Sequence, residues 1–268
     1  MLLYEGDMIM QPDVAGFLAE QKSAFAAFCQ SNDATGALEQ KTWECSLGNV
    51  EVLRWQGQVF EKASAIYCDL EIDTPPVLAR TVENPPERMR ALVLEINLFP
   101  LNPHIPKGYI ELRVHSIGKT ILAGGTDLFP YTAEDEPVSL FASRVTQVCH
   151  EHRQDYEALR KVRADFFRSK FTGEKVGSHA GIYFFSLAEE QFPFYCALAE
   201  TFFDAYGKIV QQRRQMPVTE DERRHMLTLH GQWAQWILLE DEGTRFGLEK
   251  GIPADALLGA ILPPLAIF

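Results

Sequence analysis

Two nearby stretches of the sequence carry polar side chains at alternate positions. Glu95 and Asn97 alternate with aliphatic residues in the first stretch. Tyr109, Glu111 and Arg113 alternate with aliphatic residues in the second. Because successive side chains of a β-strand point to opposite faces, these polar residues are predicted to share one face of a sheet. That face is either wet surface or the floor of a polar pocket.

Arg113 is the most specific of these polar residues. A guanidinium in a pocket or a core requires a carboxylate or phosphate partner. Glu111, two residues away, could be that partner. In a pocket, the same arginine could instead bind an anionic group of a ligand.

The segment Gly124-Gly125-Thr126-Asp127 ends a third strand-like stretch. Its glycines could let the backbone approach a ligand closely, with Asp127 accepting hydrogen bonds from that ligand. The alternative is a turn in which Asp127 caps local amide groups, and spacing alone favours this turn. The segment lacks the spacing of a dinucleotide-binding or phosphate-binding loop.

Two groups of histidines have simpler interpretations. His150 and His152 are separated by one residue, whereas helical zinc ligands are four residues apart, so we expect no metal site. His104 lies in the proline-rich turn that begins at Asn102, and we expect it to be a surface imidazole.

Strand-like patterns dominate the first half of the chain, after one helix. The predicted elements are a helix over 13–30, a hairpin that turns at Gly48-Asn49, a strand over 58–72, an irregular connection over 73–90 and three strands within 91–131. Short links between successive strands favour antiparallel pairing.

Helical patterns dominate the second half. The predicted elements are helices over 137–152, 155–169, 194–213 and 254–262, a strand over 181–185, a capping box at Thr219–Glu222 that starts a helix, and a strand over 233–239. Together the two halves predict one α+β domain over residues 1–268, in which helices cover a mostly antiparallel sheet.

Composition limits the classes of function. The formal net charge of −12 argues against broad nucleic-acid binding, which needs a basic surface. The five cysteines include no Cys-x-x-Cys pair, as expected of free thiols in a reducing cytoplasm. The first residues lack the basic segment of a signal peptide, and no uncharged run approaches the ~20 residues of a membrane span. We therefore expect a soluble cytoplasmic protein.

Ordered blocks along most of the chain are similar to those of one enzyme family. They include Gln58–Ala63, Asn102–Pro106 with Arg113, Ala123–Tyr131, Asp165–Phe167, Gly181–Phe185, Gly243–Leu248 and Leu262–Leu265. On these residues the chain resembles the oxygen-dependent coproporphyrinogen III oxidases.

The resemblance implies a flat antiparallel sheet between two layers of helices, a homodimer, and a cleft for a tetrapyrrole that carries propionates. It also implies dioxygen-dependent oxidative decarboxylation of two propionates to vinyl groups, without an organic cofactor or a metal. Asp127 matches a family aspartate that engages the pyrrole N–H groups. Arg113 matches an arginine that serves the substrate or dioxygen.

The chain departs from the family at positions that carry chemistry. Tyr109 stands where the family has its proton-donor histidine, and Glu111 stands where it has an asparagine. Phe99 and Leu101 replace a family histidine and arginine. These changes remove imidazoles that titrate near neutrality and a cation suited to propionates. Tyr109 can still donate a hydrogen bond, but its ordinary pKa of about 10 makes it a poorer acid–base partner at pH 7.

The leading hypothesis is therefore a divergent family member that binds a tetrapyrrole and, if catalytic, decarboxylates it with dioxygen. The expected catalytic residues are Asp127, Arg113 and Tyr109. The expected substrate-binding residues are Glu95, Asn97, Asn102, Glu111, Gly124 and Gly125. The alternatives are a ligand-binding protein without turnover and an oxidase or decarboxylase for a less anionic substrate.

Overall fold

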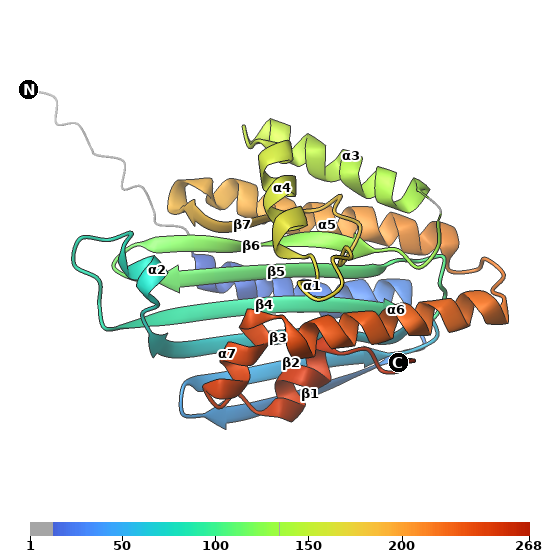
Figure 1. Cartoon of the computed structure of the whole chain (residues 1–268), viewed down its shortest axis with the longest axis horizontal. Helices are drawn as coiled ribbons and strands as arrows, with labels where there is room; N and C mark the ends of the chain where they lie inside the picture. The colour runs from blue at the N-terminus through green and yellow to red at the C-terminus, as the bar shows by residue number, and fades with distance from the viewer. Residues whose placement is uncertain (1–12, 134) are drawn as a thin grey trace, which may run out of the picture.

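The computed structural model describes residues 13–133 and 135–268. Its centre is one seven-stranded antiparallel sheet whose strands lie side by side in chain order (Figure 1). The strands are β1 Ala37–Cys45, β2 Gly48–Gln56, β3 Phe60–Asp73, β4 Arg88–Pro100, β5 Lys107–Ser116, β6 Thr120–Phe129 and β7 Ile182–Ala188. The N-terminal residues for which no signal peptide is predicted lie outside the described part.

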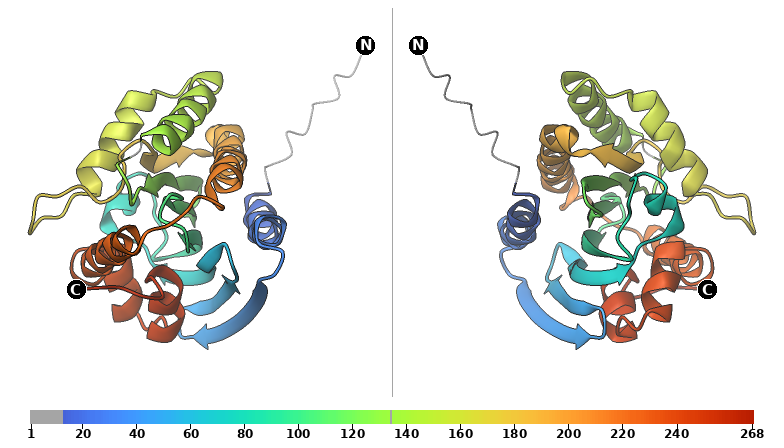
Figure 2. Two further views of the ribbon diagram at one scale, coloured as in Figure 1. Left: turned by 90° about the vertical axis from the view of Figure 1, so that its right-hand side faces the viewer. Right: turned by 90° about the vertical axis from the view of Figure 1, so that its left-hand side faces the viewer.

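Helices cover both faces of this sheet (Figures 1 and 2). The first face of the sheet packs against α1 Val14–Asn32 and α5 Phe192–Arg213, and α3 Glu136–Glu151 packs behind α5. The second face of the sheet packs against α6 Glu220–Leu239, α7 Glu242–Glu249 and α8 Ala254–Ile261. The remaining helices are α4 Tyr156–Phe166, which packs on β7, the short α2 Pro76–Ala79 and a 3-10 turn η1 Glu189–Gln191. This arrangement confirms the predicted α+β class.

The first face of the sheet is aliphatic. Leu94 and Ile96 of β4 and Ile110 and Leu112 of β5 are buried there in one core with the aromatic side chains of α1 and α5. The alternation in the sequence predicts this face, because burial of these side chains drives the sheet against the helices. The polar residues between them necessarily point to the second face.

One predicted element is wrong. Residues 233–239 are not a strand but the last two turns of α6, which the capping box at Thr219 and Glu222 starts as predicted. Trp233, Trp236 and Ile237 are spaced by three and four residues, so they share the helix face that packs on the sheet. Their size and β-branching favour a strand locally, but burial against the sheet selects the helix.

One connection also differs from the prediction. The segment over 73–90 contains the short helix α2 and the start of β4, so it is less irregular than predicted. Within the described residues, no helix is both long and apolar enough to cross a membrane.

Candidate functional site

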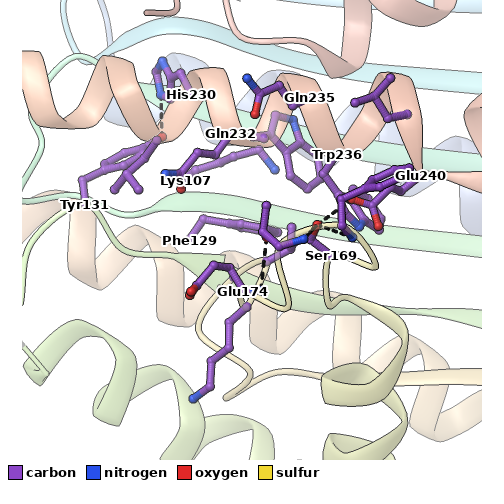
Figure 3. Close-up of a pocket in the computed structure, with 18 of the residues that line it drawn as sticks. Lys107, Phe129, Tyr131, Ser169, Glu174, His230, Gln232, Gln235, Trp236 and Glu240 are labelled. Carbon is purple, nitrogen blue, oxygen red and sulfur yellow. Dashed lines mark hydrogen bonds between the residues drawn. The ribbon is translucent and has the colours of Figure 1, made fainter. Parts of the chain in front are cut away.

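Two cavities lie between the second face of the sheet and α6. The first, of about 190 Å³, lies over the polar strand residues Glu95, Tyr109, Glu111 and Arg113, and we call it the carboxylate cavity. The second, of about 350 Å³, lies between α6 and the segment over 169–177 and is lined by Lys107, so we call it the lysine cavity (Figure 3). Trp233 and Trp236 of α6 line both cavities. The two cavities are therefore neighbouring parts of one cleft.

Strand register brings the polar residues of the carboxylate cavity together. Glu95 of β4 is directly opposite Glu111 of β5, and Tyr183 of β7 is two strands away from Glu111 through Gly125. One carboxylate oxygen of Glu111 accepts hydrogen bonds from the Tyr183 hydroxyl, at 2.9 Å, and from the Tyr109 hydroxyl, at 3.3 Å. Glu111 is thus the shared hydrogen-bond acceptor of two phenol groups.

Arg113 completes this network. Its Nε lies 3.5 Å from the other carboxylate oxygen of Glu111, and its guanidinium also donates to the Tyr183 hydroxyl. Burial is the largest single effect and disfavours the charged guanidinium, but Glu111 and the neighbouring tyrosines together outweigh it and raise the pKa of Arg113 above its ordinary value. The partner that the sequence indicates for Arg113 is therefore the one that it has, and the cation is already paired.

The surroundings raise the pKa of two other carboxyl groups of the cavity, Glu95 and Asp241. Burial, and then the negative charge of Glu111, raise the pKa of Glu95 to about 8. Asn97 donates a hydrogen bond of 2.7 Å to Glu95 but does not line the cavity. Burial also raises the pKa of Asp241, which follows α6. At neutral pH the cavity therefore combines the charged Arg113 with the Glu95 carboxyl group, which can donate or accept a hydrogen bond.

The imidazole and phenols of this cavity stay uncharged near pH 7. Burial, and then Arg113, lower the pKa of His115 to about 4. Burial, and then Glu111, raise the pKa of Tyr109 well above its ordinary value. Tyr109 is thus a hydrogen-bond donor rather than an acid–base group that titrates near neutrality.

Asp127 makes different contacts from the other predicted catalytic residues. Its carboxylate accepts hydrogen bonds from the Ser178 hydroxyl at 2.6 Å and from the backbone amides of His179 and Gly181 at 3.1 and 3.0 Å. It also forms a fully buried ion pair of 3.1 Å with Arg163 of α4. Asp127 lines neither cavity. Asp127 lies within β6 rather than in a turn, and most of its donors come from the distant residues 178–181. Its carboxylate therefore holds that segment and α4 against the sheet, which differs from the local cap that spacing favours.

Three of the predicted substrate-binding residues are also engaged in the scaffold. The Asn102 amide donates to the backbone carbonyls of Arg213 and Met216, which holds the end of α5 against the turn after β4. Gly124 has a φ of 135°, and a Cβ there would lie 2.0 Å from the carbonyl oxygen of Glu111. A Cβ on Gly125 would lie 2.2 Å from the carbonyl oxygen of Ile182. These glycines permit close strand pairing, and neither lines a cavity.

Sequence reasoning missed several residues of the cleft. Trp233, Trp236 and Asp241 come from the segment whose helix was not predicted. Lys107, at the start of β5, gives no signal of burial in the sequence. His104 is not a surface imidazole as predicted but is buried, with its Nε2 3.1 Å from the Pro217 carbonyl.

The described residues offer little to a metal ion. No group of three or more His, Cys, Asp or Glu side chains in the described ranges could hold one.

The sequence matches the model of a known family. The model of the coproporphyrinogen III oxidase family matches residues 13–268, so the chain belongs to that family. Among solved structures, it is similar to phytochromobilin synthase from tomato in complex with biliverdin, with a TM-score of 0.57 and 12% sequence identity. The likeness covers 89% of this chain and 83% of the other. At this sequence identity it shows a similar fold.

Proposed function

We propose that this protein binds a tetrapyrrole in the cleft between the sheet and α6. Membership of the coproporphyrinogen III oxidase family supports this ligand class, as does the fold shared with a protein solved with biliverdin. The observation that carries the proposal is that Glu95, Tyr109, Glu111 and Arg113 converge on one cavity beside the tryptophans of α6.

The chemistry of the carboxylate cavity suits the ring nitrogens of such a ligand. Carboxyl oxygens accept hydrogen bonds from N–H groups, and Glu111 and Glu95 offer them on adjacent strands. Because Asp127 lines neither cavity whereas Glu111 lines the carboxylate cavity, we assign the role of N–H acceptor to Glu111 in its place. Arg113 is available to a carboxylate only if that carboxylate competes with Glu111.

Aromatic side chains provide the surface for a flat ring system. The Trp233 and Trp236 rings lie 5.6 Å apart and are nearly parallel, and Phe167 packs on Trp236 at 5.0 Å. Rings of this kind bind a conjugated ligand by stacking. Neither cavity alone is large for such a ligand, so we expect it to extend along both, with movement of the tryptophans that separate them.

A titration tests the binding proposal. Biliverdin and coproporphyrin III are each added to the purified protein, and the absorbance spectrum of the ligand is recorded. We expect a saturable spectral change with one ligand per chain, at micromolar concentration or below. An unchanged spectrum with both ligands contradicts the proposal.

The proposed reaction, if the site turns over, is the oxidative decarboxylation of the family. In each step a propionate side chain loses its carboxyl carbon as CO₂ and becomes a vinyl group. The two electrons and two protons released reduce dioxygen to hydrogen peroxide. Tyr109 would act as a hydrogen-bond donor in place of the family histidine, and Arg113 would hold a carboxylate or oxygen species.

A second candidate is an enzyme that acts on a less anionic substrate. The observation that favours it is that Arg113 is already paired with Glu111, and no other Lys or Arg is among the residues that line the carboxylate cavity to attract a propionate. Protein loaded with coproporphyrinogen III without oxygen is exposed to air, and the porphyrins are separated by chromatography. Vinyl products support the family reaction. If no vinyl product forms with protein and coproporphyrinogen in equal amounts, although the ligand still binds, the protein either acts on a different substrate or binds its ligand without turnover.

Some expectations remain proposals that need their own measurements. Light scattering of the purified protein tests the homodimer that the family resemblance implies. Fractionation of cells tests the cytoplasmic location. The proposal includes no organic cofactor or metal, with dioxygen as the co-substrate.

A further inference from the structure

Lys107 is a buried amine without a hydrogen-bond partner. It is the first residue of β5, and its side chain lies on the second face of the sheet with only 1% of the residue exposed. Its Nζ has no hydrogen-bond partner among the described residues. The neighbouring buried lysine, Lys62, differs, because its Nζ donates to the carbonyls of Gly259 and Leu262. A buried amine that donates no hydrogen bond is costly and requires an explanation.

Aromatic rings surround the Lys107 amine. Its Nζ lies 3.8 Å from the ring centre of Trp233 and 4.1 Å from that of Phe129. The rings of Phe99 and Tyr109 are each 5.3 Å away. This cage has one open direction, because Lys107 also lines the lysine cavity, beside Tyr131 and Trp236 (Figure 3).

The surroundings favour the uncharged amine. Burial is the largest effect, and it lowers the pKa of Lys107 well below its ordinary value. The charged groups that act on it come from four elements: Glu95 of β4 and Asp127 of β6 favour the ammonium, whereas Arg163 of α4 and Lys62 of β3 oppose it. His230 of α6 is also near, but burial lowers the pKa of that imidazole to about 4, so it is neutral.

We propose that Lys107 is the nucleophile of an imine-forming site, and that the lysine cavity binds an apolar or aromatic aldehyde or ketone. An uncharged lysine in an apolar pocket is the form that attacks a carbonyl carbon. The geometry supports this role, because the amine is held by rings rather than by acceptors and faces a cavity of about 350 Å³. This proposal does not rest on tetrapyrrole binding.

The proposed reaction is balanced without a further reactant. The nitrogen lone pair of Lys107 attacks the carbonyl carbon, and the carbonyl π electrons move to oxygen, which receives a proton from the amine. The resulting carbinolamine loses water as the C=N bond forms. Aldehyde and amine thus give an imine and one water molecule.

The walls of the lysine cavity fit an apolar body with one hydrogen-bonding group. Phe129, Val176, Trp236 and Leu239 provide apolar surface. The Nδ1 of His230 lies 2.9 Å from the Leu265 carbonyl, which can only accept, so Nδ1 carries the proton. Nε2 therefore accepts from the Tyr131 hydroxyl at 2.8 Å, and the Tyr131 oxygen is left as an acceptor.

Reductive trapping tests the proposal. The full chain is mixed with benzaldehyde or 2-naphthaldehyde at pH 7, an imine is fixed with borohydride, and the modified lysines are identified by mass spectrometry of peptides. Exposed lysines have a pKa of about 10.4, so only about one in 2,500 is unprotonated at this pH. We expect Lys107 to be modified at least about tenfold more than the average exposed lysine, which corresponds to a pKa lower by about one unit or more.

Two variants provide the controls. Lys107→Met removes the amine but keeps most of the length of the side chain, and it is expected to abolish the preferential modification. Lys175→Met removes an exposed amine at the same cavity and is expected to leave the modification of Lys107 unchanged. Modification of surface lysines with Lys107 unmodified in the unaltered protein overturns the proposal. That result needs no variant, so it stands even if Lys107→Met does not fold. A protein that fails to bind tetrapyrroles but is modified at Lys107 separates this proposal from the preceding one.

Discussion

Glu95 and Glu111 are direct partners across β4 and β5, on the face of the sheet that α6 covers. Burial disfavours a charge on Glu95, and the facing Glu111 carboxylate adds repulsion. The consequence is that the pKa of Glu95 rises to about 8. A proton held between these strands at neutral pH is a feature of the site itself rather than of any ligand.

The first prediction is a loss of stability as pH rises. In the folded protein Glu95 has a pKa of about 8, against an ordinary value of 4.5, so the folded state binds more protons between these limits. Its contribution is fully present below about pH 4.5 and is lost as pH rises to about 8, by up to about 1.4 kcal/mol per pH unit. Urea unfolding between pH 5 and pH 8 measures this slope. Glu95→Gln, which cannot ionise, should reduce the slope, and an equal slope in both proteins contradicts the assignment.

The second prediction concerns Asp127. Asp127→Asn removes the charge that pairs with the fully buried Arg163, and we expect a loss of about 3–5 kcal/mol in the free energy of unfolding. Asp165→Asn is the control, because its pair with Lys161 is exposed and is expected to contribute little to stability. Unchanged stability of Asp127→Asn together with lost ligand binding would instead favour a direct role in the site.

The third prediction concerns close approach of the strands at Gly124. A methyl group at this position would meet the Glu111 carbonyl, in a backbone conformation with φ of 135° that other residues rarely adopt. We expect Gly124→Ala to cost more than about 2 kcal/mol, from strain and displacement of β5. Gly118→Ala is the matched control, because Gly118 also has a positive φ, of 85°, but no atom lies within 4 Å of the added carbon. Equal costs for the two variants would show that contact with β5 is unimportant.

The sequence predicts the parts of this molecule that depend on local pattern. Alternation at Leu94, Ile96, Ile110 and Leu112 identifies the core face, and the polar face follows from it. The capping box at Thr219 identifies the start of α6 for the same reason, since its hydrogen bonds are made within one turn. The opposite face of β4 and β5 could therefore be named as a candidate site in advance.

Features that depend on contacts between distant segments are not visible in the sequence. Trp233 and Trp236 favour a strand by their size, and only the sheet beneath them selects a helix. Arg163 is 36 residues beyond Asp127 in the numbering, yet it is the partner that occupies this carboxylate. Lys107 has no neighbour in the sequence that indicates burial, because its cage is assembled from β4, β5, β6 and α6.

The most direct test of the central claim is the affinity for biliverdin of Glu111→Gln. Loss of a charged acceptor should weaken binding by about 1.5–3 kcal/mol, or roughly tenfold to a hundredfold, if Glu111 holds the ring N–H groups. Glu71→Gln, on the exposed part of β3, is the control and should bind as the unaltered protein does. Thermal unfolding of both variants establishes that they are folded. The predicted result is that Glu111→Gln is folded and binds biliverdin more weakly, whereas Glu71→Gln binds it as the unaltered protein does. Equal affinities of the two variants and the unaltered protein contradict the claim.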